Sequence, residues 1–162
     1  MDYVIYTDGS YKQVDDVGPL YTGAALIYEK ESGKCLAALT KVGNDSIVTM
    51  RNVAGEIIAV VMALEHCLSV LKLKKEDNVT IYYDYQGIEA WTLNKGTQGY
   101  WKAKNPTTQG YRSYVNTVVK PAFNVQFAHV YGHTGVRGNE MVDSLAKKAI
   151  EEHVDNLRMG AE

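Results

Sequence analysis

The spacing of apolar residues changes once along this chain, close to Arg51, and that change limits the possible folds more than any other feature. Before it, runs rich in tyrosine, valine and isoleucine predict three strands, at residues 2–7, 21–29 and 35–42, with a polar loop at 12–19. After it, apolar residues recur at helical spacing and predict a long amphipathic helix that ends in the lysine-rich residues 72–75. The apolar stripe of that helix is Ile57, Val61, Leu64, Leu68 and Leu71.

The second half of the chain alternates strands with helices. Strands are predicted at 79–83 and 123–130, a short helix at 86–93, a helix at 107–119 that Pro121 ends, and a last helix that begins at Asn139 as its N-cap. We expect an α/β fold: a five-stranded mixed sheet, three antiparallel strands then two parallel additions, with helices on both faces. One domain would span residues 1–152, and residues 153–162 would form a frayed C-terminal tail.

Composition narrows the class of protein. With 46% hydrophobic residues, the chain can bury a core and is not of a disordered composition. No apolar run approaches the roughly 20 residues that span a bilayer, and the N-terminus lacks the basic start of a signal peptide. Cys35 and Cys67 lack metal-type spacing and lie within apolar patterns, so we expect buried free thiols. These features predict a cytoplasmic monomer with no membrane partner and no small-molecule cofactor.

Charge is unevenly distributed along the chain. The net charge is −2, yet no Asp or Glu occurs from Ala90 to Asn139. That stretch contains Lys95, Lys102, Lys104, Arg112, Lys120 and Arg137. One region could therefore meet phosphates while another holds cations, although a chance fluctuation on a solvated surface gives the same pattern.

Four acids occur at the ends of predicted elements, each next to a residue that faces the core. Asp8 is predicted as the last residue of the first strand with Tyr6 buried beside it, and Asp84 directly follows the fourth strand. Glu56 and Asp143 fall in the first turns of helices. If the four converge, their mutual repulsion would favour divalent cations such as Mg²⁺, which prefers oxygen ligands. The alternative is that each acid serves separately as a turn residue or as a partner of a helix dipole.

The residues around these acids resemble the four motifs of type I ribonucleases H. The matching segments are Tyr6–Ser10, Asn52–Glu56, Tyr82–Ile88 with Trp91, and Tyr131–Gly135 followed by Asn139, Glu140 and Asp143. Their order and spacing match the family over about residues 2–152. Residues 84–87 and 101–106 are most similar to a bacterial or phage branch. Because Asp8 lies so near Met1, we expect no N-terminal hybrid-binding module.

This resemblance implies a ribonuclease H-like fold. It also implies an endonuclease that hydrolyses the RNA strand of RNA–DNA hybrids and leaves 5′-phosphate and 3′-hydroxyl ends. By the same resemblance, Asp8, Glu56, Asp84 and Asp143 would bind two Mg²⁺ or Mn²⁺ ions. His133, on a glycine-rich loop, would assist proton transfer or product release, a role that suits a group titrating near neutral pH.

Contacts with the hybrid can be assigned by residue chemistry. RNA differs from DNA by its 2′-hydroxyl, which Asn52, Gln86 and the Gly9–Ser10 backbone would meet in the minor groove. Phosphate contacts could come from Lys102, Lys104 and Arg112. Trp91 would either pack along the sugars of the DNA strand or lie in the core.

Two residues depart from the family pattern. Val53 stands where many relatives have a second asparagine, and Tyr85 stands where they have a serine, so both bear on the grip on the substrate. Two other functions remain open. One is a nuclease of the same fold with a different substrate, which the glycine–histidine loop disfavours; the other is a non-catalytic nucleic-acid-binding domain, which would be favoured if an acid had been replaced.

Overall fold

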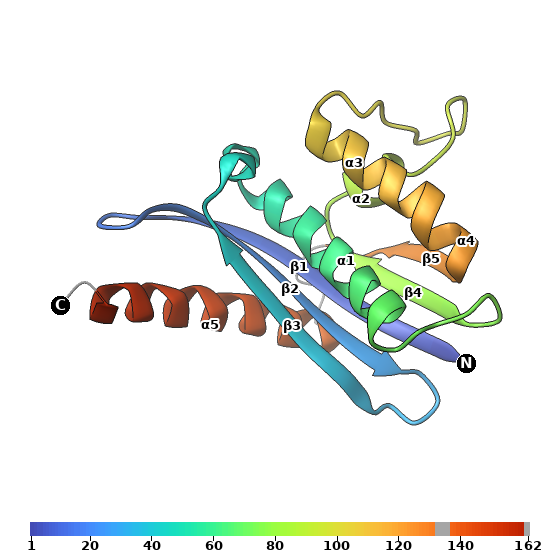
Figure 1. Ribbon diagram of the computed structural model, residues 1–162, viewed down its shortest axis with the longest axis horizontal. Coiled ribbons are helices and arrows are strands. Elements are labelled where there is room, and N and C mark those ends of the chain that lie inside the picture. The colour runs from blue at the N-terminus through green and yellow to red at the C-terminus, as the bar shows by residue number, and fades with distance from the viewer. Residues whose placement is uncertain (132–136, 161–162) are drawn as a thin grey trace.

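A computed structural model describes residues 1–131 and 137–160, and its strands form one mixed sheet in the order β3-β2-β1-β4-β5 (Figure 1). The strands are β1 (Asp2–Val14), β2 (Gly18–Glu29), β3 (Cys35–Gly43), β4 (Asn78–Tyr83) and β5 (Asn124–His129). The first three pair antiparallel, whereas β4 pairs parallel with β1 and β5 parallel with β4. The predicted mixed sheet is confirmed.

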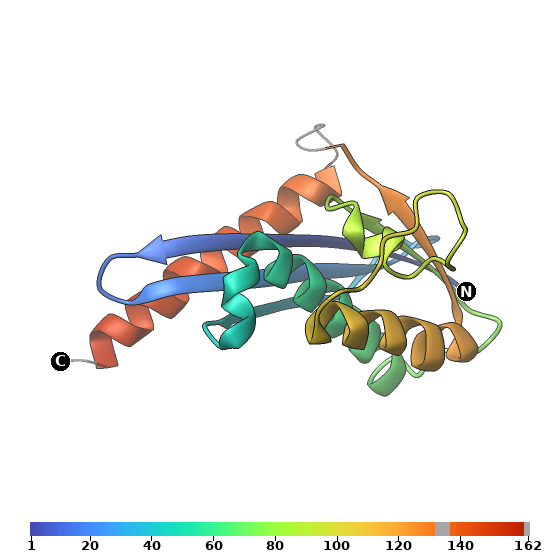
Figure 2. The same ribbon diagram turned by 90° about the horizontal axis from the view of Figure 1, so that it is seen from above.

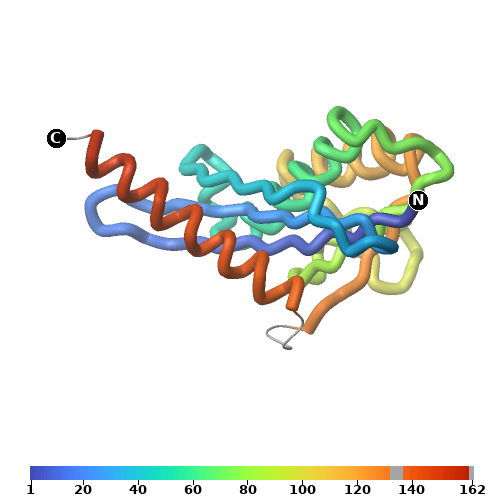
Figure 3. The backbone as a smooth tube through the Cα atoms, turned by 90° about the horizontal axis from the view of Figure 1, so that it is seen from below, coloured from blue at the N-terminus to red at the C-terminus, as the bar shows by residue number. Residues whose placement is uncertain are grey.

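Helices cover both faces of this sheet, as predicted (Figures 2 and 3). One face carries α1 (Asn52–Ser69), preceded by the short 3-10 helix η1 (Ser46–Met50), and the helical segment made of α3 (Pro106–Tyr114), the π-helical η2 (Val115–Val119) and α4 (Lys120–Ala122). The other face is crossed by α5 (Arg137–Gly160), and α2 (Gly87–Ala90) follows β4. Pro121 lies inside α4 instead of ending the helix before it.

The main core lies between the sheet and α1, and its composition reflects how closely α1 approaches the strands. Ile57 and Leu64 of the predicted stripe are buried, but Val61 and Leu68 are only partly buried. The other buried apolar residues on α1 are small or medium-sized, namely Ala54, Ala59, Val60, Ala63 and Cys67. A helix this close to a sheet leaves little room for long side chains, and α1 ends at Ser69, before the lysines.

Half of α1 is buried in the core, and this helix is long and apolar enough, by length and composition alone, to cross a membrane. Core helices commonly have such a composition, and burial against the sheet accounts for it here.

The predicted end of the first strand and the predicted end of the last helix are both wrong, because segments far apart in the sequence pack against each other. The first strand continues past Asp8 to Val14, and only residues 15–17 form the turn before β2. The predicted tail is instead helical to Gly160, because Val154 packs with the extended hairpin of β1 and β2 in a second cluster. Arg158 also contacts Asp16, at 2.9 Å. Neither element shows this support in its own local sequence.

Smaller differences concern single residues. Within the described range, α5 begins at Arg137, so Asn139 lies inside the helix instead of capping it. Cys67 is buried as expected, but Cys35 is exposed at the start of the edge strand β3. Tyr6 is only half-buried, since the fully buried side of β1 carries Ile5 and Thr7.

Candidate active site

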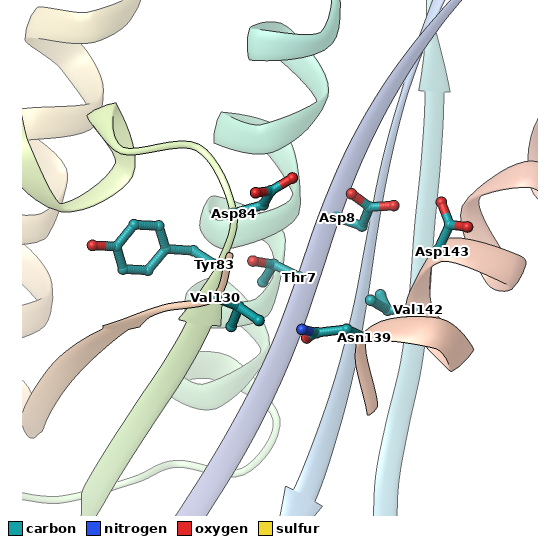
Figure 4. Close-up of a pocket in the computed structure, with 8 residues that line it drawn as sticks. All are labelled: Thr7, Asp8, Tyr83, Asp84, Val130, Asn139, Val142 and Asp143. Atoms are coloured by element: carbon teal, nitrogen blue, oxygen red, sulfur yellow. The ribbon is translucent and has the colours of Figure 1, made fainter. Parts of the chain in front are cut away.

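Three of the four predicted carboxylates line one small pocket where β1 and β4 meet the start of α5 (Figure 4). Asp8 lies within β1, Asp84 directly follows β4, and Asp143 lies in α5; their side chains lie next to one another in Figure 4. The other lining residues are Thr7, Tyr83, Val130, Asn139 and Val142. The volume, about 40 Å³, suits an ion and water better than an organic ligand.

Parallel pairing of β1 with β4 explains why two of these acids are neighbours. Tyr6 and Tyr82 pair in register and their rings stack at 5.2 Å, so Asp8 and Asp84 each lie two residues further along adjacent chain segments. Between them, the Thr7 hydroxyl donates to the Tyr82 carbonyl at 3.2 Å. The strand pairing that forms the sheet therefore also brings the two carboxylates together.

The first turn of α5 packs closely against β1. A Cβ atom on Gly138 would lie 2.4 Å from the Tyr6 ring, so only glycine fits there without a shift. Val142 is 1% exposed and packs with residues of β2. These contacts place Asp143, the next residue, at the pocket.

Glu56 approaches from the opposite face of the sheet and is 3% exposed. Its position depends on two glycines. A Cβ atom on Gly9 would lie 2.1 Å from the Glu56 amide nitrogen, and one on Gly55 would lie 2.1 Å from the Thr22 carbonyl oxygen. The missing side chains let α1 approach the strands closely enough for Glu56 to interact with Asp8 and Asp84 through the sheet.

The electrostatics of the pocket disfavour full ionisation of its acids. Burial raises the pKa of Asp8, and the hydrogen bond with Asp143 and the nearby acidic charges raise it further, against the opposing effect of the Gly9 amide. Because two carboxylates can hydrogen-bond only through a proton, the proximity of Asp143 favours the protonated form of Asp8. Burial also raises the pKa of Glu56 well above its usual range, with Asp8 and Asp84 adding to the effect.

The donor set fits a hard divalent cation. Glu56 Oε2 is buried with no hydrogen-bond partner among the described residues, and a buried carboxylate oxygen without a partner is costly. Every candidate ligand is a carboxylate, the type that Mg²⁺ and Mn²⁺ prefer. Within the described ranges, however, no three acidic, histidine or cysteine side chains are close enough to form a coordination group. The carboxylates would have to turn toward a common point to surround an ion.

Lys147 is a residue at this site that the sequence analysis missed. Its Nζ lies 3.0 Å from Asp143 Oδ2, one helical turn further along α5. The Asp143 carboxyl group and the more distant charge of Asp8 raise the pKa of Lys147. Spacing of four residues from a motif acid was a signal for this contact, but the same spacing is common on any solvated helix.

The predicted hybrid contacts fall into two groups. Asn52, Gln86, Lys102 and Lys104 are exposed, and Gly9 and Ser10 are half-buried beside the pocket, so all six stay predictions compatible with contact. His133 lies outside the described residues.

Trp91 and Arg112 have structural environments instead. Trp91 is 8% exposed and packs in the main core, so the core alternative is the correct one. Arg112 Nη1 donates to the carbonyl oxygens of Trp91 at 2.5 Å and Leu93 at 2.6 Å, and its guanidinium stacks on the Tyr100 ring. These contacts use Nη1 inside the protein, and a phosphate contact by the rest of the Arg112 guanidinium stays a prediction.

Comparison with known proteins identifies the family. The family described as RNase H matches residues 1–151. Ribonuclease H of Methylobacillus flagellatus is 31% identical over 162 residues, covering 91% of this chain and 91% of that protein. Ribonuclease H of Polynucleobacter asymbioticus is 30% identical over 155 residues, covering 92% of this chain and 90% of that protein.

Solved structures agree on the fold. RNase H1 from Halobacterium salinarum superposes with a TM-score of 0.69 at 18% identity, covering 94% of this chain and 99% of that one. LC11-RNase H1 in complex with an RNA/DNA hybrid superposes with a TM-score of 0.60 at 21% identity, covering 91% and 99%. With the family match over nearly the whole chain, these comparisons show that the chain belongs to the ribonuclease H family.

Proposed function

We propose that this protein hydrolyses the RNA strand of RNA–DNA hybrids as a metal-dependent endonuclease, leaving 5′-phosphate and 3′-hydroxyl ends. The observation that carries the proposal is the pocket in which Asp8, Asp84 and Asp143 meet, with Glu56 buried behind them. These are the four acids of the family's motifs, and none is replaced. The relatives named above are ribonucleases H, and one solved neighbour was captured with an RNA/DNA hybrid.

The family depends on divalent metal ions, and the four carboxylates are the residues that would hold two Mg²⁺ or Mn²⁺ ions in this chain. Bound together, such ions activate an attacking water and stabilise the leaving oxygen in phosphodiester hydrolysis. The raised pKa values of Asp8 and Glu56 support this assignment, because a site that gathers acids against their repulsion is built to be neutralised by cations.

The protein's own side chains would hold and orient the acids and move protons. Glu56, on α1, would supply a buried carboxylate oxygen that has no hydrogen-bond partner among the described residues, while Asp8 is held by strand pairing with β2. Lys147 holds Asp143 by an ion pair until a stronger cation competes for that carboxylate. His133, between Gly132 and Gly135 in the sequence, would move a proton or aid product release.

Substrate choice would come from exposed residues outside the pocket. Asn52 begins α1, and Gln86 comes two residues after Asp84; both are exposed and can meet the 2′-hydroxyl groups of an RNA strand. Lys102 and Lys104, also exposed, lie in the acid-free stretch and would contact phosphates. We expect the protein to act as a cytoplasmic monomer.

A cleavage assay tests the proposal. A labelled RNA–DNA hybrid, the matched single-stranded RNA, double-stranded RNA and double-stranded DNA are each incubated with the protein, with Mg²⁺ or with a chelator. Cutting confined to the RNA of the hybrid, dependent on the metal, with 5′-phosphate ends, supports the proposal. Cutting of the DNA strand, or of double-stranded RNA at the same rate, contradicts it.

A further inference from the structure

His129, the last residue of β5, lies outside the four motifs but contacts one of their acids. Its Nε2 lies 2.7 Å from the backbone carbonyl oxygen of Asp84, the same residue whose carboxylate lines the pocket. Because a carbonyl oxygen can only accept a hydrogen bond, Nε2 carries the proton and donates it. The imidazole therefore acts on the backbone of an acid of the site from outside the pocket.

The direction of this imidazole is set by two tyrosines that flank it. The ring of Tyr83 lies 5.3 Å away, and the ring of Tyr131 packs edge-to-face at 4.5 Å. Tyr83 is itself anchored, since it is 4% exposed and its hydroxyl donates to Glu89 Oε1 at 2.7 Å. An imidazole packed in this way presents its N–H in one direction.

The contact falls at the point where sheet pairing stops. Tyr83 and His129 are the last paired residues of β4 and β5, and the Val130 amide donates to the Tyr83 carbonyl at 2.7 Å. Asp84 is the next residue, beyond the strand, and its side chain is exposed. A hydrogen bond to its carbonyl fixes the peptide plane that follows Asp84 and so restricts the direction of its side chain.

We propose that His129 is a positioning residue for Asp84: its N–H holds the Asp84 backbone so that the carboxylate stays aimed into the pocket, ready for a divalent cation. This inference rests on the proposed function, because it concerns an acid of that metal site. Hydrogen bonds that orient metal ligands typically change metal affinity by about 10-fold to 100-fold when removed. The expected loss is therefore in metal affinity and turnover, with the KM for the hybrid little changed.

Two substitutions separate positioning from packing. His129→Phe keeps an aromatic ring between the two tyrosines and removes the donor. His129→Gln removes the ring and keeps an N–H donor at similar reach. His153→Phe makes the same chemical change on α5, ten residues beyond Asp143 and thus about 15 Å along the helix, and is the matched control.

The experiment measures Mg²⁺ affinity by titration calorimetry, hybrid cleavage at several Mg²⁺ concentrations, and thermal unfolding. We expect His129→Phe to weaken Mg²⁺ binding by about 10-fold and to slow cleavage most at low Mg²⁺. His129→Gln should retain affinity within about 3-fold of the wild type, and the control should match the wild type.

Two results would overturn the inference. One is wild-type Mg²⁺ affinity in His129→Phe; the other is an equal loss of affinity in both variants, in proportion to a fall in thermal stability, which would mean that the ring acts by packing. If the unsubstituted protein does not cleave the hybrid at all, the proposed function fails, while Mg²⁺ binding still reports on the role of His129.

Discussion

Two neighbouring regions of this protein treat their polar groups in opposite ways. The acid pocket, lined by Asp8, Asp84 and Asp143 with Glu56 buried behind them, gathers like charges. Glu56 Oε2 has no hydrogen-bond partner among the described residues. The aromatic lobe, which we define as the cluster of Tyr85, Trp91, Tyr100, Trp101, Tyr111 and Arg112, lies next to it. There the Tyr111 hydroxyl donates to the Ile88 carbonyl and Arg112 to two others.

The two regions differ in whether their buried polar groups have partners within the protein. In the aromatic lobe, rings pack edge-to-face, as Trp91 and Trp101 do at 5.8 Å, and the buried donors have partners from the protein. In the acid pocket, burial and repulsion raise the pKa values of Asp8 and Glu56. The fold therefore leaves these acids short of compensating positive charge. A region whose polar groups are hydrogen-bonded within the protein stabilises the fold. A region whose buried charges lack partners can bind a ligand that supplies them.

The largest expected effect comes from the acid pocket. Asp8→Asn keeps the shape of the side chain and removes a negative charge that the metal ions require. We expect cleavage of the hybrid to fall by about 1000-fold or more, the order of magnitude of a lost electrostatic contribution at a catalytic centre. Hybrid binding should survive. Single-turnover cleavage and fluorescence anisotropy measure the two quantities, and near-normal turnover would remove Asp8 from the site.

A substitution in the aromatic lobe should affect stability instead. Arg112→Gln leaves the carbonyl groups of Trp91 and Leu93 without their charged donor, and we expect the free energy of unfolding to fall by about 2–3 kcal/mol. Urea denaturation measures this change. The salt dependence of hybrid binding should stay as in the wild type; a shallower dependence with unchanged stability would show that Arg112 faces phosphate after all.

The pH dependence of stability tests the raised pKa of Glu56 directly. In a chelator, the unfolded chain releases the Glu56 proton near its ordinary pKa of about 4.3, whereas the folded protein retains it because its pKa is raised. The free energy of unfolding therefore falls as pH rises above that value, by up to about 1.4 kcal/mol per pH unit, until the folded pKa is passed.

Glu56→Gln removes this dependence, so the variant should gain stability over the wild type as pH rises from 5 to 8. Mg²⁺ should then stabilise the wild type more than the variant. Urea denaturation across this range, with chelator and with Mg²⁺, provides both comparisons. Parallel pH curves for the two proteins would contradict the raised pKa.

The smallest effect is expected from an exposed lysine of the acid-free stretch. Lys102→Gln removes one charge from a solvated side chain, so stability should be unchanged. If Lys102 contacts a phosphate, hybrid affinity should fall by a few-fold, and the slope of log affinity against log salt should decrease by about 1. Lys34→Gln, on the hairpin between β2 and β3, is the matched control. Identical slopes for the two variants would exclude the contact.

Local sequence predicted the elements well wherever one segment carries its own signal. The alternation of strands and helices, the mixed sheet and the long helix beginning near Arg51 all follow from the spacing of apolar residues. Element ends were predicted less well. Residues 12–14 and 153–160 have polar sequences that indicate loop and tail, yet Val14 and Val154 pack against each other's elements and extend both. Contacts between residues so far apart cannot be read from either segment.

The sequence by itself determined which acids are the candidates, because four segments that resemble the family's motifs, in the same order, contain Asp8, Glu56, Asp84 and Asp143. Only the tertiary structure decided how they meet: Gly9 and Gly55 let α1 approach the sheet, and burial raises the pKa values. The structure also separated Arg112, whose Nη1 donates within the protein, from His129, whose donor reaches Asp84. Residue type and spacing are written in the chain, whereas burial and hydrogen-bond partners depend on which distant segments fold together.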